Sequence, residues 1–164
     1  MKALDGQEPY FNEELYELVI CDQIWMEELE AAVFRDDFCK DKLKMLVVED
    51  EPSTASNIKR LLCRRFNAYV DVAADLATAR LLLGSCRYDL VTLDQLLPDG
   101  SGIEFLIELH HNPCVPRVVM VSALDRSSID PDPLDLGAFD YIMKDEKMAC
   151  LLPNAVRRAL GMAQ

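Results

Sequence analysis

The sequence lacks any long apolar run. Across its 164 residues, no apolar stretch approaches the length of roughly 18 residues that a membrane-spanning helix needs. The first ten residues, MKALDGQEPY, have no apolar signal core. We therefore expect a cytoplasmic chain that has no contact with a membrane.

Positive charge is also scarce. The chain has 17 Lys and Arg against 29 Asp and Glu, a formal net charge of -12. Nucleic acid and anionic bilayers select clusters of Lys and Arg, so neither is an expected partner. An excess of carboxylates suits a protein that binds a metal cation or meets basic partner surfaces.

Closely spaced cysteines are absent. The six cysteines are scattered, with no Cys-x-x-Cys: Cys21, Cys39, Cys63, Cys86, Cys114 and Cys150. Metal-ligating cysteines usually come in close pairs, so we expect free thiols in a reducing compartment. Apolar residues make up 51% of the chain, enough for a packed core without disulfides.

An amphipathic helix is predicted over residues 12–38. Asn12 can cap it, apolar residues recur every three or four positions, and acids take the other face. The apolar stripe contains Trp25 and Phe34, so something must cover it. Two interpretations stay open: packing on its own domain, and dimerisation or partner binding. We define residues 1–43, with 12 acids and 4 bases, as an acidic N-terminal helical extension.

Strands and helices alternate over residues 44–164, the second predicted domain. Short apolar runs predict five strands, at residues 44–48, 69–73, 88–93, 116–121 and 139–143. Helical patterns between and after them cover residues 52–66, 75–83, 102–111 and 151–162. This alternation predicts an α/β fold with a parallel sheet and right-handed crossovers.

The fourth crossover departs from the pattern. Between Ser122 and Phe139 the chain carries Pro131 and Pro133, which remove two amide donors within three residues. Each proline also disfavours helical geometry in the residue before it. We predict a fourth helix that is short, late or partly irregular.

Polar residues stand at the carboxyl ends of four predicted strands: Glu49 and Asp50, Asp94, Ser122, and Lys144. In a parallel sheet these ends share one rim. Three carboxylates there repel one another unless a cation neutralises them, and oxygen ligands suit Mg²⁺. Lys144 and Ser122 add a charge and a hydrogen-bond donor for a phosphoryl group. Asp94 is the predicted nucleophile, which would form an aspartyl phosphate.

These residues resemble the bacterial response-regulator receiver domain over about residues 43–163. The resemblance rests on four motifs: Glu49–Asp50 after VV, Asp94 in DQLLPDGSG, Ser122–Ala123 after VMV, and Tyr141-x-x-Lys144. The resemblance implies a flavodoxin-like, doubly wound, five-stranded parallel sheet of order 2-1-3-4-5. The N-terminal helix would be an addition to that fold.

The resemblance also implies roles. Asp94 would accept a phosphoryl group from a histidine kinase or a histidine phosphotransfer protein. Ser122 and Lys144 would contact that group, and Tyr141 would be an aromatic switch that turns inward as Ser122 moves. The Mg²⁺ site would comprise Asp50, Asp94 and the backbone carbonyl of Leu96, with Glu49 assisting through water.

One residue departs from the family pattern. Asp145 follows Lys144, where the family usually has a proline, often after a cis bond. A cis bond before a non-proline residue costs about 3–4 kcal/mol. We therefore expect a trans bond or a rearranged turn at this position.

The resulting prediction is a stand-alone receiver, or a piece of a longer protein, that signals by protein contact or phosphoryl relay. It would not be an enzyme beyond its own phosphorylation and dephosphorylation. One alternative is a non-switching scaffold that acts through the N-terminal helix. Another is a phosphate-ester hydrolase with an aspartyl nucleophile. Haloacid-dehalogenase-like enzymes place a second Asp two residues after the first, where this chain has Leu96.

Overall fold

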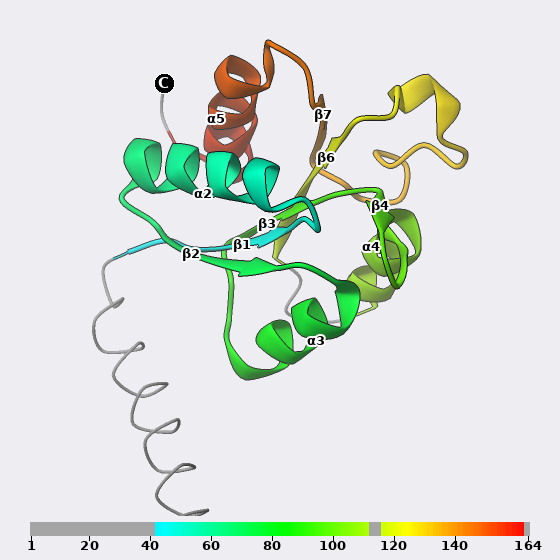
Figure 1. The fold of residues 1–164 in the computed structure, drawn as a ribbon, viewed down its shortest axis with the longest axis horizontal. Coiled ribbons are helices and arrows are strands. Elements are labelled where there is room, and N and C mark those ends of the chain that lie inside the picture. Colours follow the sequence, from blue (N-terminus) through cyan, green and yellow to red (C-terminus); the bar gives the residue numbers. More distant parts are fainter. Residues whose placement is uncertain (1–41, 112–115, 163–164) are drawn as a thin grey trace, which may run out of the picture. The chain divides into compact units, whose positions relative to one another are not determined.

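A computed structural model describes residues 42–111 and 116–162 of the chain (Figure 1). Its centre is a sheet of five parallel strands: β1 Lys44–Val48, β2 Tyr69–Ala73, β3 Leu90–Leu93, β6 Arg117–Ser122 and β7 Asp140–Met143. Their spatial order is β2-β1-β3-β6-β7, which confirms the predicted flavodoxin-like order. The helix predicted over residues 12–38 lies outside the described residues.

Helices cover both faces of the sheet. Helices α2 (Pro52–Phe66) and α5 (Met148–Ala159) lie on one face, and α3 (Leu76–Ser85) and α4 (Gly102–His110) lie on the other (Figure 1). Strand residues alternate between two cores: Val47 belongs to the α2/α5 core and Leu46 to the α3/α4 core. Both are fully buried, as expected for a strand covered on both faces. No helix in the described part of the chain has the length and apolar character needed to cross a membrane.

The N-terminus of α2 is fixed next to the end of β1. Glu51 accepts hydrogen bonds from the backbone N–H groups of Ser53 and Thr54, at 3.1 and 2.7 Å. Pro52 occupies the first turn, as predicted, where its missing N–H costs nothing. The helix ends at Phe66 and is followed by Asn67, a left-handed residue with φ of 47°. The crossover therefore starts directly at the rim that carries Glu49.

Helix α3 is longer than predicted. The sequence pattern places its end at Leu83, before Gly84, but the helix continues to Ser85. The N–H of Cys86 closes the last turn on the carbonyl of Leu82, at 2.9 Å. A glycine inside a helix costs only about 1 kcal/mol relative to alanine, so Gly84 does not force an end.

The β6–β7 connection contains a single 3₁₀ turn, η1 (Arg126–Ser128), in place of a fourth α-helix. The side chains of Asp125 and Asp132 accept backbone N–H groups two residues further on, at 2.8 and 3.0 Å. Such local bonds satisfy the backbone where Pro131 and Pro133 prevent a helical ladder. The predicted irregularity of this crossover is confirmed, and the predicted fourth helix is reduced to this one 3₁₀ turn.

Helix α5 begins at Met148, so the prediction that it starts at residue 151 is wrong. Asp145 is the cause: its carboxylate accepts the N–H of Lys147 at 2.8 Å, and its carbonyl accepts that of Met148 at 3.1 Å. These bonds turn the chain into the helix immediately after β7. Pro153 consequently lies inside the helix, where it is buried.

Candidate functional site

The strand ends place the predicted residues at one rim of the sheet. The last residues of β1 and β3 are partners in the sheet register, so Glu49 and Asp94, which follow them, are neighbours. The last residues of β6 and β7 are also partners. Ser122 ends β6, and Lys144 directly follows β7. The carboxyl edge of a parallel sheet thus gathers residues from four distant segments.

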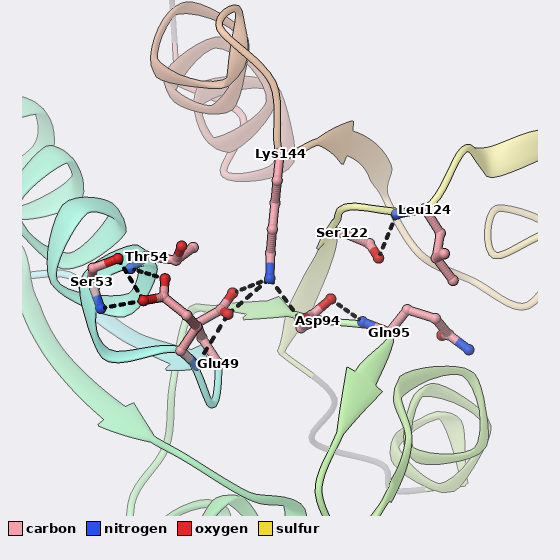
Figure 2. Close-up of polar contacts among 9 residues, drawn as sticks. Glu49, Ser53, Thr54, Asp94, Gln95, Ser122, Leu124 and Lys144 are labelled. Carbon is pink, nitrogen blue, oxygen red and sulfur yellow. Dashed lines mark hydrogen bonds and ion pairs between the residues drawn. The ribbon is translucent and has the colours of Figure 1, made fainter.

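Lys144 is the centre of this cluster. Its ammonium donates to Glu49 Oε1 at 2.8 Å and to Asp94 Oδ2 at 2.6 Å (Figure 2). The Lys144 side chain is 16% exposed, and those of Glu49 and Asp94 are 1% and 7% exposed. With so little access to water, the attraction between these charges is only weakly screened. One partly buried cation therefore holds two buried acids together.

The local environment shifts the pKa of two of these groups. Burial raises the pKa of the Glu49 carboxyl, and the hydrogen bond from Lys144 opposes that rise only in part. Burial on its own would lower the pKa of the Lys144 ammonium. Its hydrogen bonds to Asp94 and Glu49 outweigh this effect, and the pKa of Lys144 rises. Lys144 therefore stays charged at neutral pH.

The acids fit a small divalent cation. Glu49, Asp50 and Asp94 each offer one carboxylate oxygen, and these oxygens all lie within 4.8 Å of one another. The buried Oε2 of Glu49 lies 2.6 Å from the Lys144 nitrogen but accepts no hydrogen bond of acceptable geometry. A divalent cation would give this oxygen a second positively charged partner. An all-oxygen donor set with one exposed member, Asp50, suits Mg²⁺, which keeps several waters.

Ser122 and Tyr141 are connected through one residue, Leu124. The buried Ser122 Oγ accepts the N–H of Leu124 at 3.3 Å, and the Tyr141 hydroxyl donates to the carbonyl of Leu124 at 2.7 Å. The Tyr141 ring is half-buried against the α3/α4 core, and this burial raises the pKa of its hydroxyl. The two residues predicted to move together are thus joined by hydrogen bonds.

The loop after Asp94 forms a small hairpin, β4 (Leu96–Leu97) and β5 (Gly100–Ser101), which the sequence did not predict. Gly102, the first residue of α4, packs directly against Asp94. A Cβ at this position would lie 2.1 Å from the Asp94 carbonyl oxygen, so only glycine fits. Leu96 is 59% exposed, and the role of its carbonyl as a metal ligand stays a prediction.

Asp99 anchors the other end of this hairpin. Its carboxylate accepts the N–H groups of Leu76 and Ala77, the first residues of α3, both at 2.9 Å. These donors lower the pKa of the Asp99 carboxyl. Sequence reasoning missed this contact, which joins positions 22 and 23 residues apart and has no local signature.

The peptide bond between Lys144 and Asp145 is trans, as predicted. The cis bond found in residues 42–111 and 116–162 is that between Asp130 and Pro131. Asp145 also takes part in the turn that starts α5. This turn therefore keeps Lys144 within reach of the acids without a proline after it.

Comparison with known proteins places this architecture in one family. Residues 45–155 match the family described as the response regulator receiver domain. The transcriptional regulatory protein CitB of Klebsiella pneumoniae is 32% identical over 108 residues, which cover 63% of this chain and 45% of CitB. The cell cycle transcriptional regulator CtrA of Caulobacter vibrioides is 32% identical over 127 residues, which cover 74% of this chain and 54% of CtrA. The chain thus matches about half the length of these relatives.

Solved structures agree with the sequence match. The response regulator TrrA of Thermotoga maritima, solved in complex with Mg²⁺ and BeF, has a TM-score of 0.65 and 26% identity. The match covers 72% of this chain and 99% of TrrA. A Francisella response regulator receiver domain has a TM-score of 0.64 and 26% identity, with 73% of this chain and 98% of that chain covered. The chain therefore belongs to the family of response regulator receiver domains.

Proposed function

We propose that this chain is a phosphorylatable signalling receiver in which Asp94 accepts a phosphoryl group in the presence of Mg²⁺. The observation that carries the proposal is the buried contact of Lys144 with both Asp94 and Glu49, next to the exposed carboxylate of Asp50. A nucleophile, a fixed cation and a set of oxygen ligands are the parts that phosphoryl transfer requires.

The proposed transfer is a single displacement at phosphorus. A carboxylate oxygen of Asp94 forms the new P–O bond, while the bond from phosphorus to the donor breaks and its electron pair leaves with the donor. For a phosphohistidine donor this is a P–N bond, and the released imidazole is neutral once it takes up a proton. Bound Mg²⁺ would supply charge neutralisation for the phosphoryl oxygens. Lys144 and the Ser122 hydroxyl would each donate to one phosphoryl oxygen.

The readout would begin at Ser122. In the structure, the Ser122 hydroxyl accepts a hydrogen bond from the Leu124 N–H at 3.3 Å. That bond would break when the hydroxyl turns to the phosphoryl group. Leu124 also holds the Tyr141 hydroxyl through its carbonyl. A shift at Ser122 would therefore reach Tyr141 through two hydrogen bonds and change the surface that a partner meets.

Known relatives support the proposed donor and cation. TrrA was solved with Mg²⁺ and BeF, a phosphoryl mimic. A 103-residue stretch of the sensor kinase/phosphatase LuxQ of Vibrio harveyi is 30% identical to this chain and covers 12% of that protein. We propose a histidine kinase or histidine phosphotransfer protein as donor, another protein as target, and the cytoplasm as the location. Hydrolysis of small-molecule phosphate esters is disfavoured. Leu96 stands where haloacid-dehalogenase-like enzymes have their second Asp, and it cannot act as an acid or a base.

The test is phosphorylation by a small donor. Incubation with acetyl phosphate and Mg²⁺ should add one phosphoryl group, measured by intact-protein mass spectrometry. Asp94→Asn should gain none, and neither should the wild-type protein in EDTA. Asp99→Asn is the matched control, since Asp99 lies in the same loop but contacts α3. An Asp94→Asn variant that gains phosphate at the wild-type level would refute the proposal.

A further inference from the structure

Gln95 follows Asp94 in the loop between β3 and α4. All four of its polar groups make hydrogen bonds. Its backbone N–H donates to Asp94 Oδ1 at 2.6 Å, and its backbone carbonyl accepts the N–H of Gly102 at 2.9 Å. In the side chain, Oε1 accepts the N–H of Ile103 at 3.0 Å, and Nε2 donates to Ser101 Oγ at 3.1 Å. Gln95 thus joins the predicted acceptor to the first turn of α4.

The side chain of Gln95 caps α4 from another segment. The first N–H groups of a helix have no partner inside it and are usually capped by the residue that precedes the helix. Ser101 holds that position, yet its hydroxyl makes no cap bond. Gln95 Oε1 takes the N–H of Ile103 instead. The amide orientation is unambiguous, because only the oxygen of the Gln95 amide can accept from a backbone N–H.

This cap couples the helix to the Asp94 carboxylate. Gly102 presses against the Asp94 carbonyl, with room for no Cβ, so α4 and the acceptor backbone are in direct contact. The Gln95 N–H holds Asp94 Oδ1, while Lys144 holds Oδ2 (Figure 2). Both carboxylate oxygens are therefore fixed, one through the end of α4 and the other through β7.

We propose that Gln95 is a positioning residue for phosphoryl transfer: it clamps the loop after the acceptor onto α4 and so fixes the orientation of the Asp94 carboxylate. This inference rests on the proposed function and adds to it a residue that touches neither phosphate nor metal through its side chain. Phosphoryl transfer depends on in-line geometry, and displacements of about 1 Å cost up to about 100-fold in rate. The same clamp sets the path of the backbone at Leu96, the predicted carbonyl ligand.

Three variants separate positioning from stability. Gln95→Met keeps the length of the side chain and removes both of its hydrogen bonds. Gln95→Glu keeps an oxygen for the Ile103 N–H, and its second oxygen can accept from the Ser101 hydroxyl. Ser101→Ala removes the contact with Nε2 and leaves the bond from Oε1 to Ile103. In Gln95→Met the freed Ser101 hydroxyl can itself cap α4, so the helix need not lose stability.

The measurements are the phosphorylation rate with acetyl phosphate at saturating Mg²⁺, the Mg²⁺ dissociation constant by calorimetry, and the thermal midpoint. For Gln95→Met we expect a rate about tenfold lower and weaker Mg²⁺ binding, with a midpoint close to that of the wild type. The phosphorylation rate of Gln95→Glu should be within about twofold of the wild-type rate. The rate of Ser101→Ala should lie between those of Gln95→Met and Gln95→Glu.

Two results would overturn the role of Gln95. One is a Gln95→Met variant with wild-type rate and Mg²⁺ affinity. The other is a rate that falls only in proportion to the unfolded fraction and is not recovered in Gln95→Glu. A wild-type protein that gains no phosphoryl group would instead count against the proposed function. In that case the Mg²⁺ affinities of the variants would still decide whether Gln95 holds the loop.

Discussion

The Lys144 ammonium donates to Asp94 Oδ2 at 2.6 Å, although 50 residues separate the two positions in the chain. The same ammonium contacts Glu49, 95 residues away. Lys144 therefore neutralises buried acids that a divalent cation would also neutralise. This relationship links the stability of the domain to the occupancy of its proposed metal site.

Replacing Lys144 with methionine should expose that link. Lys144→Met leaves Glu49 and Asp94 as unpaired buried acids, and we expect the free energy of unfolding to fall by about 3 kcal/mol at neutral pH. Added Mg²⁺ should stabilise the variant more than the wild type, because it replaces the lost charge. Chemical unfolding with and without Mg²⁺ measures both effects. Lys59→Met, at an exposed position of α2, is the control, and an equal loss there would contradict the prediction.

The pH dependence of stability should report the contact of Asp99 with α3. The pKa of Asp99 is lowered in the folded state by the N–H donors of Leu76 and Ala77. Its ionised form therefore stabilises the fold above the ordinary value of 3.8, and this contribution is lost as pH falls through the lowered pKa. Asp99→Asn should lower the thermal midpoint at pH 7 by roughly a few degrees.

The midpoints of wild type and Asp99→Asn should converge as the pH falls below 3.8, which thermal scans at several pH values will test. Asp50→Asn is a useful comparison, because Asp50 is an exposed acid of the proposed metal site and, within the described part of the chain, makes no hydrogen bond to a helix start. A midpoint difference at Asp99 that stays constant with pH would show that its charge is not the cause.

Gly102 should not tolerate alanine. A Cβ would lie 2.1 Å from the Asp94 carbonyl oxygen, so the backbone of the acceptor must move. We expect Gly102→Ala to lose about 1–3 kcal/mol of stability and to be phosphorylated more slowly. Gly84→Ala is the matched control: Gly84 is also helical, a Cβ there meets nothing within 4 Å, and the change should stabilise α3 by up to about 1 kcal/mol. Equal effects at the two glycines would argue against the close contact.

The predicted helix over residues 12–38 should make the chain a dimer. Its apolar stripe contains Trp25, and such a stripe needs a partner surface. Trp25→Glu should reduce the molar mass measured by light scattering from dimer to monomer, whereas Glu27→Gln, on the opposite side of the predicted helix, should leave it unchanged. A wild-type chain with the mass of a monomer would exclude this role.

The strands and the acids at their ends were predictable from sequence. Buried parallel strands appear as short apolar runs, and a charged residue immediately after such a run, such as Asp94 or Lys144, stands out. The contacts of Gln95 and Asp99 were not predictable. Gln95 contacts the start of α4, 8 residues away, and Asp99 contacts the start of α3, 23 residues away. Only the folded chain brings these groups together. The early start of α5 has the same origin, a side-chain contact in the turn after Lys144.

The β6–β7 connection of this receiver differs mechanically from an α-helix. A continuous helix would tilt as a rigid rod, but here each turn is closed by its own short-range bond, such as those made by Asp125 and Asp132. The Arg126 guanidinium also donates to the Asp132 carboxylate, so the two turns are joined. A displacement that starts at Ser122 should therefore move the segment from Asp125 to Asp132 as one bonded unit, without the lever arm that a continuous helix would supply.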